Sequence, residues 1–372
     1  MARVTVDGKR LTFYAKKRED AAAWLNQTLA DKQRGLLVAP TKETFGHWLD
    51  VWLTEYAKPH IRPTTYADYE SLIRVHLKPA LENILLKDLR PEHLQKLYND
   101  KTATGLSPRR VRLIHTVAHA ALKQAVRNQL VARNVAEATT LPRQPKREIH
   151  VLSQEEQEKF LAVLDQDRLG VAFLVDLWTG LRRGELLGLK WQDIDLKKGV
   201  LRVKRSLVRV PIKKGETELR FQEPKTESGR RSIPLPPSIV SALKAHRKEQ
   251  AKEKLIMGQE YQDNALVFCR SDGRPLDPSY FTYRFHQLLK KAGVNDTNFH
   301  ALRHTFATRM LELGESAKVA QEILGHSNIS MTLDTYSHVL PELKDAAAQK
   351  LEELYLSMQE KIASAEAKAK NH

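Results

Sequence analysis

The sequence of 372 residues contains only one cysteine, Cys269. A single thiol cannot form a disulfide within the chain or supply a zinc site built from several cysteines. We therefore expect a reducing compartment, the cytoplasm. Long apolar runs are also scarce, because Asp176 interrupts the longest one, from residue 170 to residue 181. The N-terminus lacks the apolar core of a secretion signal, so we expect neither export nor a membrane span.

Acidic residues are outnumbered by basic ones. There are 61 Lys and Arg residues against 45 Asp and Glu residues, which gives a formal net charge of +16. A surplus of this size favours a polyanionic partner, most commonly nucleic acid, over a merely soluble basic protein. The length exceeds that of one ordinary compact core, so we expect more than one domain.

Residues 1–40 predict a small N-terminal module. Two alternating segments flank Asp7-Gly8, which is the pattern of a β-hairpin with a two-residue turn. A helix from Glu19 to Ala30 then brings Trp24 against the hairpin. Two strands and one helix make a very small core, so the module is either marginal or stabilised by a partner.

Residues 43–140 predict a helical domain, whose first helix carries apolar residues from Phe45 to Tyr56 at steps of three and four. On its last helix His115 and His119 have metal-ligand spacing, but Thr116 stands where a zinc peptidase needs glutamate, so structural histidines are the better interpretation. The basic residues of this helix can contact DNA phosphates. These candidates are Arg109, Arg110, Arg112, Lys123 and Arg127.

The second half of the chain predicts a larger mixed domain. Residues 141–150 contain two prolines and several charges without periodicity, which is typical of a linker. Residues 151–340 combine helices with short strands, and we expect the strand at 200–210 to join one small antiparallel sheet with Lys225 near a hairpin tip. Residues 341–372 predict an amphipathic C-terminal helix and a tail. The expected fold is mainly α with small β-sheets (α+β).

Three polar residues of this domain, Arg182, His300 and Arg303, suit the binding of an anion. Arg182 emerges between two buried helices, although Glu185 three residues later equally allows an ordinary ion pair. His300 and Arg303 are three residues apart, so they project from one face of a helix. His300 and His304 have zinc-ligand spacing, but Arg303 beside them would repel a cation, and no metal is expected.

Three further residues complete a site for phosphoryl transfer. Gly325 ends a helix and turns His326 outward. Guanidinium groups bind the non-bridging oxygens of a phosphate, while histidines and a lysine such as Lys225 exchange protons with it. Tyr336 is the candidate nucleophile, since a cationic pocket favours its phenolate. The candidate catalytic residues are Arg182, Lys225, His300, Arg303, His326 and Tyr336.

In this order, these residues resemble the signature of the tyrosine recombinase, or phage integrase, family. The resemblance covers about residues 153–340, and the helical segment looks like the SAM-like core-binding domain of that family. It implies that Arg182, Lys225, His300, Arg303 and His326 hold and protonate the scissile phosphate while Tyr336 attacks it. It also implies a clamp on double-stranded DNA, a 3′-phosphotyrosyl link, a Holliday junction and a homotetramer, with no metal or nucleotide cofactor.

The same resemblance implies an integrase of a phage or of an integrative or conjugative element, associated with the nucleoid when bound to DNA. The C-terminal helix would then act in trans between protomers. The N-terminal module looks like an arm-DNA-binding module trimmed to two strands, so the sequence also allows a chromosome-dimer resolvase. A type IB topoisomerase is a second hypothesis, against which stand the small helical domain on a linker and the C-terminal helix. A non-catalytic DNA-binding protein is a third, against which stands the intact set of six residues.

Overall fold

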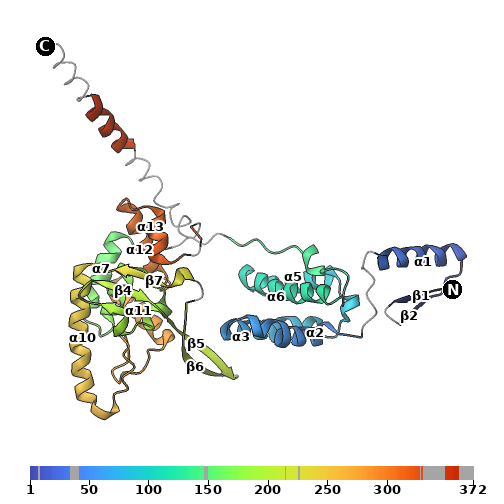
Figure 1. Cartoon of the computed structure of the whole chain (residues 1–372), viewed down its shortest axis with the longest axis horizontal. Helices are drawn as coiled ribbons and strands as arrows, with labels where there is room; N and C mark the ends of the chain where they lie inside the picture. The colour runs from blue at the N-terminus through green and yellow to red at the C-terminus, as the bar shows by residue number, and fades with distance from the viewer. Residues whose placement is uncertain are drawn as a thin grey trace. The chain divides into compact units, whose positions relative to one another are not determined.

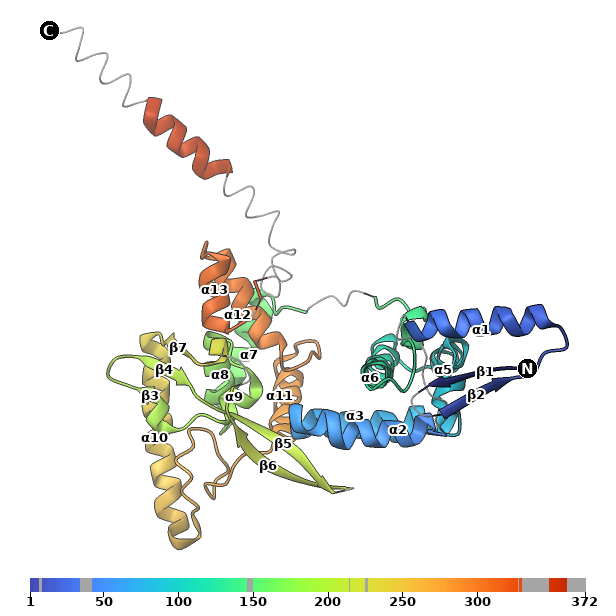
Figure 2. The ribbon, with the colours of Figure 1, turned by 45° about the vertical axis from the view of Figure 1, so that its right-hand side comes forward.

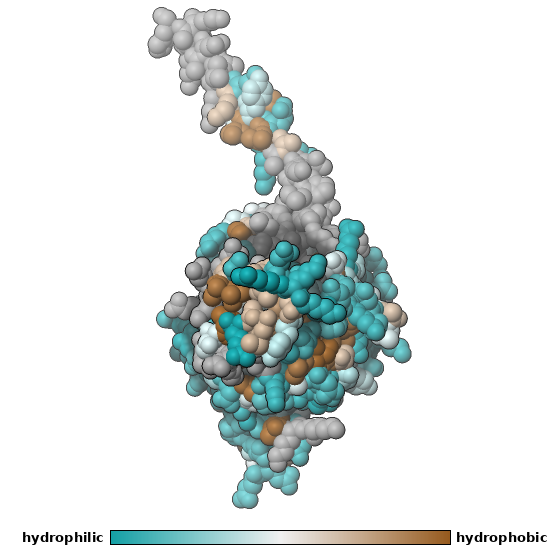
Figure 3. All heavy atoms as spheres, turned by 90° about the vertical axis from the view of Figure 1, so that its right-hand side faces the viewer, coloured by the Kyte–Doolittle hydropathy of each residue, from teal (hydrophilic) through white to brown (hydrophobic). Residues whose placement is uncertain are grey.

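The computed structural model describes residues 1–6, 9–33, 42–145, 150–213, 215–224, 227–326, 328–329 and 348–359. The chain divides into two compact units, Met1–Lys146 and Arg147–His372, and each is described by itself (Figure 1). Among these residues no helix is long and apolar enough to cross a bilayer. Figure 3 shows a face on which hydrophilic residues predominate and apolar patches are scattered.

The first unit begins with the predicted hairpin. Strand β1 (Ala2–Val6) pairs antiparallel with β2 (Lys9–Phe13), and α1 (Arg18–Gln33) follows. Trp24 of α1 stacks on Phe13 with the ring centroids 5.2 Å apart, so the predicted packing of helix on hairpin is confirmed. The predicted turn at Asp7-Gly8 lies outside the described residues.

The helical part of the first unit is organised around α6 (Pro108–Arg127). Its N-cap is Ser107, whose Oγ accepts a hydrogen bond from the Arg110 N–H, and its apolar face is buried. Trp48 donates its indole N–H to the carbonyl of Ala121 on α6. The other helices are α2 (Phe45–Val51), which continues as a π-helical segment (Trp52–Ala57), α3 (Pro63–Leu72), which continues likewise (Ile73–Leu77), α4 (Lys78–Leu81) and α5 (Pro91–Ala103).

Tyr56 differs from the prediction for the first helix of this domain. It is exposed at 37%, whereas Trp48 and Trp52 on the same segment are buried. Its hydroxyl accepts a hydrogen bond of 2.7 Å from the Asn128 side chain. The phenol therefore covers the edge of the core and keeps its polar end in a hydrogen bond with the residue that ends α6.

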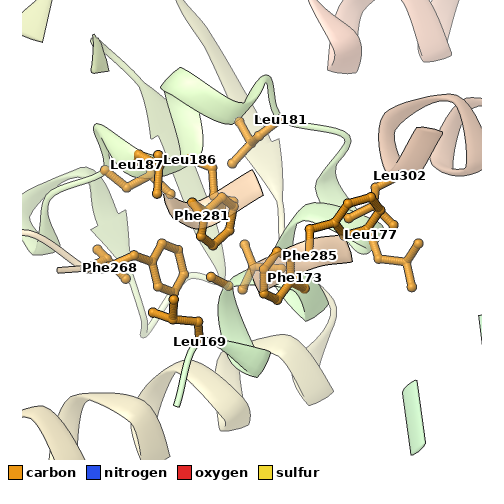
Figure 4. Packing of buried hydrophobic residues seen from close by; sticks show 14 of the residues in the cluster. Leu169, Phe173, Leu177, Leu181, Leu186, Leu187, Phe268, Phe281, Phe285 and Leu302 are labelled. Carbon is orange, nitrogen blue, oxygen red and sulfur yellow. The ribbon is translucent and has the colours of Figure 1, made fainter. Parts of the chain in front are cut away.

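An aromatic cluster forms the core of the second unit. Phe173 of α8 (Gly170–Thr179) stacks on Phe281 of α11 (Pro278–Ala292) with ring centroids 4.5 Å apart, and Figure 4 shows Phe285 beside them. Burying side chains of this size stabilises the fold by about 2–3 kcal/mol each. The remaining helices are α7 (Gln154–Leu164), α9 (Arg183–Leu187), α10 (Pro237–Met257), α12 (Ala301–Glu312) and α13 (Ala317–Leu324).

The strands of the second unit form two sheets, where the sequence predicted one. The first has three antiparallel strands with β4 in the middle, and the second is a separate two-stranded hairpin. In Figures 1 and 2 the hairpin extends away from the three-stranded sheet. The strands are β3 (Ile194–Asp195), β4 (Val200–Val203) and β7 (Arg231–Pro234) in the first sheet, and β5 (Ser206–Lys213) and β6 (Glu216–Gln222) in the second.

The prediction of one strand from 200 to 210 is wrong because Lys204 and Arg205 interrupt it. Both form ion pairs with Asp193, whose side chain is 1% exposed. These ion pairs leave the two basic residues outside both sheets and separate β4 from β5.

Part of the predicted C-terminal helix is described, and residues 348–359 are helical. Leu351, Leu354 and Met358, which share its apolar face, are exposed. Figure 3 shows apolar side chains on this segment. The beginning of the predicted helix at Pro341 lies outside the described residues.

Candidate active site

Two helices end in left-handed glycines at the centre of the candidate site. Gly180 caps α8 with φ 59°, and Gly325 caps α13 with φ 66°. The last carbonyls of a helix lack partners within it and carry partial negative charge. Two such helix ends close together therefore favour a positively charged hydrogen-bond donor between them.

Arg303, in the first turn of α12, is the positively charged donor to both helix ends. Its Nη1 donates to the Gly180 carbonyl at 2.5 Å, and its Nη2 donates to the Leu324 carbonyl at 2.7 Å. The residue is only 2% exposed. A guanidinium has five N–H donors, so these two bonds leave donors available to a ligand. The planar fork is thus fixed by the ends of two helices.

Arg182 lies beside this fork in the extended residue before α9. Its Nη2 donates to the Gly325 carbonyl at 3.0 Å, and its Nη1 pairs with Glu185 at 2.7 Å. The side chain of Arg182 is 40% exposed while that of Glu185 is 6% exposed. The ion pair that the sequence allows is therefore present, and it orients a guanidinium that keeps an open side.

Glu185 bridges two guanidinium groups. Its Oε2 accepts a hydrogen bond of 2.8 Å from Arg231 at the start of β7. Burial opposes ionisation of Glu185, but the hydrogen bond and charge of Arg231, followed by the charge of Arg182, outweigh it and lower the pKa of the carboxyl. Arg231 contributes to the site although the sequence analysis missed it, since nothing in the local pattern distinguishes this strand residue from its neighbours.

Gly325 allows α13 to approach the residues before β7. A Cβ atom at this position would lie 2.6 Å from the Ser228 carbonyl oxygen and 2.9 Å from Cδ of Arg231. Both the positive φ and the close approach require glycine. The glycine of the Leu-Gly-His motif is therefore required for close packing against Ser228 and Arg231 as well as for ending the helix.

The two histidines border the guanidinium groups in a cationic environment. Burial, followed by the charges of Arg303 and Arg182, lowers the pKa of His326 to about 3. Partial burial of the ring, followed by the charges of His304 and Arg303, lowers the pKa of His300 to about 4. Both imidazoles are therefore neutral near pH 7, and a bound anion would raise their pKa values by reversing the local charge.

Asp176 is a buried acid that the sequence analysis noted only as a break in an apolar run. It is 0% exposed, and neither carboxylate oxygen has a hydrogen-bond partner among the described residues. Burial raises the pKa of Asp176 well above its usual value, against the opposing charge of Arg303. Burial and the charges of Arg182 and Arg231 lower the pKa of Arg303 to about 9, so its guanidinium stays charged at pH 7. The site keeps an excess of positive charge.

Four of the six predicted catalytic residues meet at this site. Hydrogen bonds to the ends of α8 and α13 place two guanidinium groups beside the Leu-Gly-His turn. The predicted lysine, Lys225, and the predicted nucleophile, Tyr336, lie outside the described residues. The four described residues are Arg182, His300, Arg303 and His326.

The candidate DNA-binding residues of α6 differ in exposure. Arg109, Lys123 and Arg127 are exposed, and Arg110 is half-buried. Arg112 donates from Nε to the Pro142 carbonyl at 3.0 Å, which ties down the chain beyond the helix. Three of the five side chains are thus freely presented to solvent.

His115 has polar contacts within the first unit. Its Nδ1 lies 3.3 Å from the Tyr98 hydroxyl and 3.4 Å from the Thr139 hydroxyl. Burial, then the charges of His119 and Arg112, lowers its pKa. These contacts support the structural role that the sequence predicts for this histidine.

The chain matches two family models. Residues 150–342 match the phage integrase family, and residues 44–102 match the phage integrase N-terminal SAM-like domain. A XerC-like tyrosine recombinase of Caldanaerobacter subterraneus subsp. tengcongensis is 34% identical over 361 residues, covering 93% of this chain and 92% of the relative. The ICEBs1 integrase of Bacillus subtilis is 24% identical over 301 residues, and the alignment covers 79% of this chain and 78% of that integrase.

Solved structures show the same fold. The Tn1549 transposon integrase in complex with transposon right end DNA aligns with a TM-score of 0.69 at 23% identity, over 82% of this chain and 99% of that one. A lambda integrase tetramer bound to a Holliday junction aligns with a TM-score of 0.60 at 22% identity, over 88% of this chain and 89% of that one. These alignments support the predicted α+β architecture.

Proposed function

Because the chain belongs to the phage integrase family, we propose that the cluster around Arg303 holds the scissile phosphate of double-stranded DNA. The protein is then a site-specific recombinase, the integrase of a mobile element, which cuts and rejoins DNA through a covalent phosphotyrosyl intermediate. The observation that carries the proposal is the convergence of Arg182 and Arg303 on the ends of α8 and α13. This arrangement presents two charged forks with little reorganisation.

The chemistry follows from the charge that develops on the phosphate. The phenolate oxygen of Tyr336 attacks phosphorus and forms the phosphotyrosyl ester, and the bond from phosphorus to the 5′-oxygen breaks as Lys225 gives that oxygen a proton. Arg182 and Arg303 bind the non-bridging oxygens, and the neutral rings of His300 and His326 donate hydrogen bonds. The 3′-phosphotyrosyl ester conserves the bond energy, so a 5′-hydroxyl can reverse the step and rejoin a strand without metal or nucleotide.

The remaining segments support DNA binding and assembly in this proposal. Residues 1–40 form an arm-binding-like module, 43–140 the core-binding domain, 141–150 the linker and 151–340 the catalytic domain. The net charge of +16 favours a clamp on DNA. The proposed location is the cytoplasm, at the nucleoid when the protein is bound to DNA. Residues 341–372 act in trans within a homotetramer, which is supported by the exposed apolar side chains of residues 348–359.

Supercoiled DNA carrying candidate attachment sites tests the function. A recombinase forms an SDS-resistant protein–DNA adduct and recombinant products. Relaxation of any plasmid without recombinants would favour the type IB topoisomerase instead. Binding without an adduct would favour the non-catalytic DNA-binding protein.

A further inference from the structure

A second groove adjoins His300 on the side of α11. It is lined by Arg183 of α9, by Thr282 and His286 of α11, and by the segment from Asp296 to His300. His300 therefore borders both the Arg303 cluster and this groove. A ligand that extends from the Arg303 cluster on the side of His300 would therefore enter this groove.

Two consecutive arginines lie at the two sites, Arg182 at the Arg303 cluster and Arg183 in the groove. Arg182 precedes α9 in an extended conformation, with φ −74° and ψ 145°, and its guanidinium reaches Gly325. Arg183 is the first residue of α9, and its Nη1 donates to the Thr282 hydroxyl at 2.6 Å. The change from extended to helical backbone sends the two side chains in different directions. Their guanidinium groups thus occupy neighbouring but separate positions.

Arg183 carries a charge that no carboxylate neutralises among the described residues. Its partner is a neutral hydroxyl, and burial lowers its pKa without an opposing acid. Arg284 on α11 shows the usual arrangement, an ion pair with Asp167. The acid in the groove, Asp296, pairs with His286 instead. A guanidinium in this position favours an anionic ligand.

The segment that leads to His300 presents polar groups on a rigid support. Thr297 and Phe299 are buried, whereas Asn298 and His300 are exposed, so alternate side chains face outward. The ring of Phe299 packs against that of Phe281 with centroids 5.4 Å apart. The amide and the imidazole are therefore held in a fixed relation to each other on the groove side.

We propose that this groove binds the DNA phosphate next to the scissile one on the same strand. Arg183 provides the charge-assisted hydrogen bond, and the side chain of Asn298 provides a neutral donor. The inference rests on the proposed function, because that function places the scissile phosphate beside Arg303. It assigns to Arg183 a contact with substrate DNA that positions the strand for cleavage.

Loss of one phosphate contact has a defined effect on binding. The slope of log affinity against log salt changes by about 0.9 for each neutralised phosphate of a duplex. Arg183→Gln should therefore make this slope shallower by about 0.9 and weaken binding roughly tenfold. Arg270→Gln is the control, because Arg270 is exposed and already pairs with Asp272. Its salt slope should stay within error of that of the wild-type protein.

The decisive experiment combines each variant with chemically altered DNA. The probe is a duplex selected from random sequences by the wild-type protein, with the cleavage position mapped from its covalent product. One neutral methylphosphonate replaces either phosphate that flanks the scissile one, and fluorescence anisotropy measures the dissociation constant. We expect a methylphosphonate at one of the two positions to reduce the DNA affinity of the wild-type protein and of Arg270→Gln roughly tenfold. The same substitution should leave the affinity of Arg183→Gln almost unchanged.

Equal methylphosphonate effects in the wild-type protein and Arg183→Gln, at both positions, would overturn the inference. Asn298→Ala is a second variant that leaves the guanidinium in place, and it should show a partial loss of the same coupling. The proposed function has its own readout in the same samples. If the wild-type protein binds but forms no covalent adduct, the recombinase proposal fails, and the inference fails with it because no scissile phosphate is defined. If the adduct forms and the methylphosphonate effects are equal, only the inference fails.

Discussion

Arg303 and Gly180 are 123 positions apart in the sequence, and the guanidinium of the first donates a hydrogen bond to the carbonyl oxygen of the second. This bond joins the first turn of α12 to the residue that ends α8. The second nitrogen of the same fork reaches the end of α13 at Leu324. The orientation of the proposed phosphate ligand therefore depends on where two helices stop.

Arg303→Lys should reduce the rate of covalent adduct formation by about 100-fold or more. A single ammonium cannot reproduce the planar fork, and loss of one donor at a developing charge typically costs a factor of this order. Single-turnover cleavage of a nicked duplex measures the rate. The free energy of unfolding should also fall by about 1–3 kcal/mol for each helix-end carbonyl left without a partner, as measured by urea denaturation. An adduct rate close to that of the wild-type protein would contradict the assigned role.

Gly325→Ala should destabilise the protein more than Gly293→Ala. Both glycines have positive φ, 66° and 67°, but a Cβ at 293 meets nothing within 4 Å while a Cβ at 325 meets the Ser228 carbonyl at 2.6 Å. The backbone conformation alone costs about 1 kcal/mol in each variant. The clash should add about 1–3 kcal/mol at position 325 and displace the carbonyl that orients Arg182. Equal losses of thermal stability in the two variants would show that the close approach is unimportant.

Asp176→Asn should be more stable than the wild-type protein at neutral pH. Folding raises the pKa of this buried carboxyl, so between its unfolded and folded pKa values the native state binds a proton that the unfolded state lacks. Stability is therefore lost as pH rises through that interval, and the variant escapes this loss. The advantage of Asn should shrink as the pH falls below about 4. A less stable variant at pH 7 would mean that an ionised Asp176 balances the charge of Arg303.

His326→Asn should reduce the loss of unfolding free energy that the wild-type protein shows as the pH falls below neutrality. The folded pKa of His326 is about 3, below the usual value of 6.5, so the native state binds fewer protons than the unfolded state at intermediate pH. Stability from this group is present above pH 6.5 and is lost as the pH falls towards 3. The loss between pH 8 and pH 5 amounts to about 2 kcal/mol. Urea denaturation at both pH values measures it, and an unchanged pH dependence in the variant would disprove the assignment.

The helices of this chain could be predicted from the sequence because their signals are local. The Ser107 cap of α6, the apolar steps that begin at Phe45 in α2 and the glycine end of α13 each depend on residues within one or two turns. The sheets could not be predicted to the same extent. Whether residues 200–210 form one strand or two depends on ion pairs of Lys204 and Arg205 with Asp193, which local alternation does not reveal.

The candidate site divides in the same way. Arg182, His300, Arg303 and His326 could be found because their residue types and order are distinctive, and the structure brings them together. Arg231 could not be found, because it acts through a buried carboxylate 46 positions earlier in the chain. Arg183 could not be singled out either. Its charge is left unpaired because no carboxylate of the described residues forms an ion pair with it, which a sequence motif does not reveal.

The role of Tyr336 as nucleophile can be tested by identifying the residue that becomes attached to DNA. A nicked duplex that releases a short leaving strand traps the covalent product, and mass spectrometry of its proteolytic peptides locates the nucleotide. We expect a nucleotide on the peptide that contains Tyr336, and no such product from Tyr336→Phe or from Arg303→Gln. A nucleotide on another residue, or a trapped adduct that persists in Tyr336→Phe, would contradict that role.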